Sequence, residues 1–121
     1  MSDHLGEDQR DELLREVAAR RERTVARITA LEHDFDDIVE ASSDAVRDDE
    51  HDPEGATIAF ERAQVSALLA DARGQLTALD VAAERLAGPD AGRCERCGGA
   101  IAHERLLARP ASTRCVGCAG R

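Results

Sequence analysis

The stretch "GRCERCGGAIAHERLLARPASTRCVGC", residues 92–118, contains every cysteine of the chain, at Cys94, Cys97, Cys115 and Cys118. They form two Cys-x-x-Cys pairs with 17 residues between them. Thiolates at positions i and i+3 of a tight turn can reach one ion, and Zn²⁺ accepts four of them at about 2.3 Å. The spacing predicts a four-cysteine site for one structural zinc ion, in which no coordination position is open for a catalytic water.

Other uses of the cysteines fit the sequence less well. The acidic N-terminus "MSDHLGEDQRDELL" is unlike a signal peptide, and no apolar run approaches the roughly 20 residues that span a bilayer. We therefore expect a soluble cytoplasmic protein, in which cysteines stay reduced rather than forming disulfides. Unrelated free thiols and a redox-active pair remain alternatives. His103 could replace one ligand, although a lone histidine at such a position is more often exposed.

Upstream of the cysteines, apolar residues recur with a helical period. One helix is expected from about residue 8 to 47, with a seam of Leu14, Val17, Thr24, Ile28, Leu31, Phe35 and Ile38. A second is expected from Pro53 to about Ala87, with a seam of Ile58, Val65, Leu68, Ala72, Leu76, Leu79, Ala83 and Leu86. Gly88, expected in the left-handed conformation, and Pro89 end this helix.

Two long helices with a short connection fold back on each other as an antiparallel hairpin. The two seams match in a register that centres the turn between His51 and Asp52, with Asp52 as N-cap and Pro53 in the first turn. The expected fold class is all-α, a long antiparallel coiled-coil helical hairpin with a C-terminal four-cysteine zinc finger. Residues 1–88 would form the N-terminal segment and hairpin, with its tip at 48–55, and residues 89–121 the zinc-finger module.

Charge is distributed unevenly along this chain of 121 residues and net charge −9. Between Glu32 and Glu54, eleven acidic residues accompany one basic residue, whereas residues 92–121 contain six Arg and two Glu. Solvated surfaces would explain both regions. The alternative is partner binding, through Asp49, Glu50, Asp52 and Glu54 at the tip and through Arg105 and Arg109 in the finger. The net charge disfavours sequence-specific DNA binding, and the sequence contains no pattern typical of an enzyme.

Residues 94–118 also carry a family pattern of Cys-x-x-Cys-Gly, then Ile, Arg-Leu-x-Ala-x-Pro and Cys-x-x-Cys. The matching residues are Cys94, Cys97, Gly98, Ile101, Arg105, Leu106, Ala108, Pro110, Cys115 and Cys118. Together with the hairpin and its Asp-Pro tip, this pattern resembles the DksA/TraR group of bacterial transcription regulators. The resemblance covers about residues 10–121.

The resemblance implies a regulator that binds RNA polymerase without contacting DNA, through insertion of the hairpin into the secondary channel. Tip carboxylates then lie near the catalytic Mg²⁺ ions, and some members act together with the nucleotide ppGpp. The activating tip of the family reads Asp-x-x-Asp-x-Ala, whereas here Asp52 matches the first acid and Gly55 stands at the second. The alternative function is a zinc-ribbon adaptor that binds protein or nucleic acid through its Arg-rich finger. A monomer is expected, because the seam is used within the hairpin.

Overall fold

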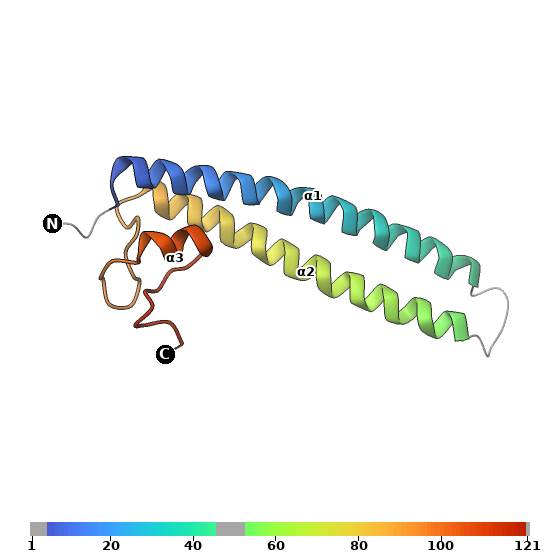
Figure 1. Ribbon diagram of the computed structural model, residues 1–121. Coiled ribbons are helices and arrows are strands. Elements are labelled where there is room, and N and C mark those ends of the chain that lie inside the picture. Colours follow the sequence, from blue (N-terminus) through green and yellow to red (C-terminus); the bar gives the residue numbers. More distant parts are fainter. Residues whose placement is uncertain (1–4, 46–52, 121) are drawn as a thin grey trace. The chain divides into compact units, whose positions relative to one another are not determined.

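The computed structural model describes residues 5–45 and 53–120, apart from the side chains of residues 43–45, 53 and 54. Its three helices are α1 (Glu7–Ala45), α2 (Pro53–Ala87) and α3 (His103–Ala108) (Figure 1). Within these ranges the only β-pairing is an isolated antiparallel bridge between Arg93 and Ala100. The predicted all-α class and the two long helices are confirmed. No described helix combines the length and the apolar character that a membrane span requires.

Local chemistry explains where the helices begin and end. At the start of α1, the Gly6 N–H donates to Gln9 Oε1 at 3.1 Å, and Glu7 and Asp8 place negative charge near the positive end of the helix dipole. Proline is tolerated in the first helical turn, and α2 begins at Pro53 as predicted. At the end of α2, the Gly88 N–H donates to the Arg85 carbonyl at 3.1 Å.

The left-handed conformation predicted for Gly88 is wrong. Among the described residues, positive φ angles occur only at Gly92, Gly98 and Gly120. The 3.1 Å bond to Arg85 spans three residues, so a tighter final turn ends α2 without a left-handed residue.

By its own contacts the chain divides into two units, one of Met1–Glu22 with Leu76–Arg121 and one of Arg23–Gln75. The first is called the finger unit below and the second the hairpin unit. Both long helices contribute to each unit. The division expected from the sequence at residue 88 stays a prediction.

The core of the finger unit joins three parts of the chain. It consists of Leu13 and Val17 from α1, Leu79, Ala82 and Leu86 from α2, and Cys94, Ile101 and Leu106 from the segment after α2. Leu13 is fully buried and Leu14 only partly, although the sequence placed Leu14 in the seam. Leu13 and Ala82 are buried outside the predicted seam because the finger residues belong to the same cluster. An ion pair between Arg21 Nε and Asp80 Oδ1, at 2.8 Å, also links the two helices.

The hairpin unit is held by a narrower interface. Leu69 and Ala72 are buried there, Glu32 Oε2 lies 2.9 Å from Arg73 Nη2, and the Arg62 guanidinium lies over the Phe35 ring at 5.8 Å. The seam position predicted for Leu68 is wrong, because Leu68 is 38% exposed and its neighbour Leu69 is 6% exposed. Leu69 continues the regular alternation of four and three residues that runs from Val65 to Ala72 and on to Leu76, which is typical of coiled-coil packing.

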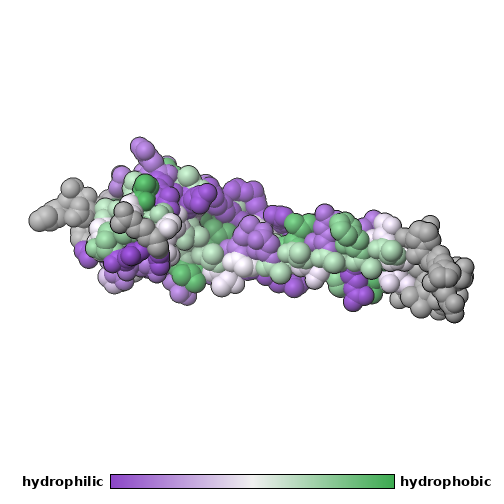
Figure 2. Space-filling view, turned by 90° about the horizontal axis from the view of Figure 1, so that it is seen from below, coloured by the Kyte–Doolittle hydropathy of each residue, from purple (hydrophilic) through white to green (hydrophobic). Residues whose placement is uncertain are grey.

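Large hydrophobic side chains also reach the surface. On the face shown in Figure 2, hydrophobic residues lie among hydrophilic ones. Those exposed among the described residues are Val25, Phe60, Leu68, Val81 and Val116. Single exposed apolar residues are ordinary on soluble proteins, so they carry no functional conclusion by themselves.

The adjacent leucines of α2 provide a matched test of this packing. Leu69→Ala should lower the free energy of unfolding by about 2–5 kcal/mol, because it removes buried methyl groups and leaves a cavity. Leu68→Ala should cost less than about 1 kcal/mol, because much of that side chain already contacts water. Denaturant unfolding of both variants shows which leucine lies in the interface between α1 and α2. An equal or larger loss of unfolding free energy for Leu68→Ala would contradict the position of Leu69.

Candidate metal centre

Two glycines shape the backbone around the first pair of cysteines. Gly92 and Gly98 have φ angles of 73° and 74°, in the left-handed region that side chains disfavour. At Gly92 a Cβ atom would also lie 2.8 Å from Leu5 Cγ. The Gly98 N–H donates to the Cys94 carbonyl at 3.0 Å, and the Cys94 N–H donates to the Gly99 carbonyl at 2.7 Å. This closed turn brings Cys94 and Cys97 to one side.

The second pair is held by a similar turn and by links to the first. The Cys118 and Ala119 N–H groups donate to the Cys115 carbonyl at 3.1 and 2.9 Å. The Glu95 N–H donates to the Thr113 carbonyl at 2.8 Å, and Thr113 Oγ1 donates to Glu95 Oε2. These bonds join the two turns directly, so the position of one pair restrains the other.

The four cysteine sulfur atoms all lie within 4.8 Å of one another. Two thiolates bound tetrahedrally at about 2.3 Å from one zinc ion are about 3.8 Å apart. Cys97 Sγ and Cys115 Sγ are separated by 3.8 Å. The Gly99 N–H also donates to Cys97 Sγ at 3.4 Å. The donor set and its spacing therefore fit one zinc ion with four sulfur ligands.

The surroundings of the sulfurs shift two thiol pKa values in opposite directions. Backbone N–H groups, chiefly those of Cys115 and Cys97, lower the pKa of Cys94 from 9.0 to about 6. The side-chain hydrogen bond with Cys115, followed by burial, raises the pKa of Cys118 to about 12. Cys94 therefore ionises far more readily than Cys118. A bound zinc ion would supply the positive charge that allows all four sulfurs to be thiolates.

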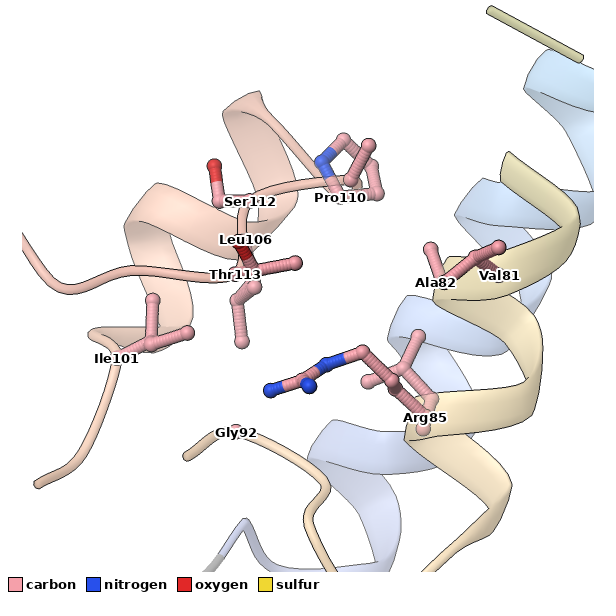
Figure 3. Close-up of a pocket in the computed structure, with 11 residues that line it drawn as sticks. Val81, Ala82, Arg85, Gly92, Ile101, Leu106, Pro110, Ser112 and Thr113 are labelled. Carbon is pink, nitrogen blue, oxygen red and sulfur yellow. The ribbon is translucent and has the colours of Figure 1, made fainter. Parts of the chain in front are cut away.

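Arginine side chains from the long helices anchor the finger. Arg20 Nη2 donates to the Leu107 carbonyl at 3.0 Å while Arg20 Nε contacts Glu16 Oε2 at 2.6 Å. Arg85 Nη2 donates to the Arg93 carbonyl at 2.7 Å, and Figure 3 shows Arg85 extending from α2 between Gly92 and Leu106. The cavity beside it is only about 20 Å³, room for about one water molecule. It is a packing gap rather than a ligand site.

The other predicted site residues are placed differently. His103 does not join the sulfur cluster, because its Nε2 atom lies 3.1 Å from Glu12 Oε1. Arg105 Nε donates to the Arg114 carbonyl at 3.1 Å, so its side chain holds the finger together, whereas Arg109 is exposed. Three tip residues, Asp49, Glu50 and Asp52, lie outside the described residues. So does the side chain of Glu54, whose backbone belongs to α2.

Sequence reasoning missed the anchoring residues Arg20 and Arg85. Both bind backbone carbonyl groups of the finger, and no spacing pattern marks such contacts. The one available signal was the position of Arg85 in the last turn of α2, which by itself indicates only an interaction with the helix dipole.

Removal of the metal should affect the two units differently. We expect one zinc ion per chain, and we expect a chelator to unfold the finger while most helical signal remains, because the contacts of the hairpin unit contain no metal ligand. Metal analysis and circular dichroism before and after chelation measure both effects. A zinc content near zero in reduced, folded protein would contradict the site, and loss of nearly all helix would contradict the independence of the hairpin.

Zinc affinity should rise with pH. Zinc binding must displace the proton of Cys118, whose pKa is about 12, so affinity should increase about tenfold per pH unit for each proton released. Below about pH 6 the thiol of Cys94 is protonated too, so the dependence should steepen. Competition with a chelator of known protonation behaviour between about pH 5 and 8, at roughly half-unit steps, tests this. A flat profile would show that the sulfurs are already ionised.

Comparison with known proteins agrees with this geometry. Residues 89–121 match the prokaryotic dksA/traR C4-type zinc finger family. This match and the four-sulfur cluster confirm the predicted cofactor, one zinc ion. Comparison with curated protein sequences found no significant match.

Among solved structures, the chain is similar to the transcription factor DksA2 from Pseudomonas aeruginosa. The TM-score is 0.80 at 26% sequence identity, and the alignment covers 97% of this chain and 84% of DksA2. The similarity therefore extends beyond the finger to both long helices. The finger therefore matches the dksA/traR zinc-finger family, and the chain as a whole resembles the transcription factor DksA2 in fold.

Proposed function

We propose that this protein regulates transcription by binding RNA polymerase, with the hairpin inserted in the secondary channel and its acidic tip directed to the active site. The observation that carries the proposal is the similarity to the transcription factor DksA2 over 97% of the chain, together with the matching zinc finger. Binding to polymerase also implies a cytoplasmic location.

The charge distribution supports this use of the hairpin. Eleven acidic residues and one basic residue lie between Glu32 and Glu54, and Glu32, Asp34, Asp36, Asp37 and Glu40 are exposed on α1. Carboxylates near a tip could approach catalytic Mg²⁺ ions, which prefer oxygen ligands. In this proposal Asp49, Glu50, Asp52 and Glu54 enter first, and ppGpp could bind at the polymerase interface. Gly55, in place of the second family acid, leaves Asp52 as the matching carboxylate.

The protein acts by binding rather than by catalysis. A zinc site of four cysteines uses all four coordination positions for sulfur, so zinc folds the finger and activates no water molecule. The finger then supports the base of the hairpin through the shared core of Leu13, Val17, Leu86, Ile101 and Leu106. A monomer inserts its own hairpin, so the regulator requires no second copy.

A second candidate function is an adaptor that binds through the arginines of the finger. Exposed Arg96 and Arg109 favour it, whereas the contact of Arg105 with the Arg114 carbonyl reduces the cationic surface available to a partner. A pull-down with purified RNA polymerase, with and without competing double-stranded DNA, separates the two functions. Retention of polymerase in both conditions supports the first proposal, and binding to DNA alone supports the adaptor.

A charge change at the tip tests how the regulator would act. Asp52→Asn should preserve helix capping, because asparagine caps about as well as aspartate. If the carboxylate acts near the polymerase Mg²⁺ ions, the variant should keep its melting temperature and its affinity for polymerase but lose its effect on transcription in vitro. Asp49→Lys with Glu50→Lys should instead weaken binding itself.

The control is Asp90→Asn, which removes the same charge from an exposed residue distant in sequence from the tip. It should leave binding and transcription unchanged. If Asp52→Asn also leaves the transcriptional effect intact, the carboxylate of Asp52 acts only as a cap, and the activity depends on neighbouring acids or on occlusion of the channel.

A further inference from the structure

A groove of about 450 Å³ runs along the hairpin unit between its two helices. It is lined by Glu32, Phe35 and Asp36 from α1 and by Ser66, Leu69, Ala70 and Arg73 from α2. Several of these residues are four positions apart, at 32 and 36, at 66 and 70, and at 69 and 73. Such residues lie one helical turn apart on one face, so the groove follows the helix direction.

The chemistry of the groove is apolar at its floor. Leu69 is buried, Phe35 is half-buried, and Ala70 is exposed beside them. Ser66 and Ala70 have small, exposed side chains, and exposed Ala63 and Ala67 extend this small-residue surface of α2. Small residues allow another helix to approach closely, at interaxial distances of about 8–10 Å.

The charged side chains that line the groove differ in whether they have a partner of opposite charge. Arg73 is paired with Glu32 at 2.9 Å, and Arg62 lies over the Phe35 ring. Within the described part of the chain, Asp36 makes no ion pair. Exposed Asp34 and Glu40 add negative charge on the same helix. The groove therefore combines an apolar floor with an unneutralised carboxylate in an acidic surrounding.

We propose that this groove binds an amphipathic α-helix of a protein partner. The apolar side of the partner helix packs on Phe35 and Ala70 above the buried Leu69, and a lysine or arginine of the partner pairs with Asp36. This is the helix-in-groove mode of recognition, in which apolar residues one turn apart supply affinity and flanking charges set the orientation. The groove lies on the hairpin that the proposed function inserts in the polymerase channel, so the peptide experiments below use the free protein without polymerase.

Charge complementarity favours a basic partner over a second copy of the chain. Each copy has a net charge of −9. Two copies therefore repel each other, and an acidic groove attracts a helix of the opposite charge.

A synthetic peptide provides the probe. It has about 20 residues, Leu and Ala at positions i, i+3, i+4 and i+7 on one face, and Lys on both flanks. Fluorescence anisotropy with the full-length, zinc-loaded protein at physiological salt measures its affinity. Two comparison peptides carry Glu in place of Lys, or the same Lys-containing composition in a shuffled order. We expect the amphipathic Lys peptide to bind at least about tenfold more tightly than either.

Matched variants locate the site. Ala70→Lys should weaken binding at least about tenfold, because its side chain fills the groove and repels the peptide, whereas Gln64→Lys adds the same charge at an exposed position outside the lining. Asp36→Asn should weaken binding about fivefold, and Asp34→Asn, which removes an equal charge outside the lining, should have little effect. Circular dichroism and melting temperature confirm that each variant is folded.

Three results would overturn the proposal. Equal binding of the shuffled peptide, or equal losses for Asp36→Asn and Asp34→Asn, would show that the general acidity of α1 attracts the probe. Unchanged binding by folded Ala70→Lys would show that the groove is not the site. Sedimentation that shows a dimer of the free protein, broken by Ala70→Lys, would make a second copy the occupant.

Discussion

The finger unit depends on one geometric constraint, the approach of four sulfur atoms to within 4.8 Å of one another. Without a metal ion, thiolates this close together repel one another, so protonated thiols are favoured. The raised pKa of Cys118 reflects this effect. Backbone N–H groups offset part of it at Cys94, whose pKa is lowered. Zinc coordination removes the conflict, and structural zinc sites contribute on the order of 10–16 kcal/mol in small finger peptides. The zinc finger itself, residues 89–121, is short and has few other sources of stability.

The sulfur cluster is linked to both long helices through the core of the finger unit. Cys94 is both a sulfur donor and a member of the buried cluster that contains Leu13, Val17 and Leu86. Arg20 and Arg85 add hydrogen bonds from α1 and α2 to carbonyl groups of the finger. Partly buried carbonyl groups gain from such partners, and a guanidinium with several donors can reach them while its stem covers apolar surface. The metal centre therefore also organises the ends of the helices nearest to it.

The hairpin unit has a different balance of forces. Its interface is narrow, with Leu69 and Ala72 buried and the Glu32–Arg73 ion pair exposed at its edge. Exposed ion pairs contribute little stability, so the apolar seam holds this unit together. A narrow seam with small neighbouring residues also leaves the groove beside Phe35 uncovered.

The sequence by itself determined the parts of this protein that depend on local spacing. Two Cys-x-x-Cys pairs predicted the zinc site, and the apolar period with Pro53 predicted both long helices, because ligand reach and helical repeat are short-range properties. The tertiary structure alone decided which neighbouring residues are buried. Leu69 rather than Leu68 lies in the seam, Leu13 is more buried than Leu14, and Arg105 turns to the Arg114 carbonyl. Adjacent residues differ by about 100° around a helix. The apolar pattern of the sequence therefore allows either of two adjacent leucines on the buried face, and only the packing of the neighbouring helix decides which one is buried.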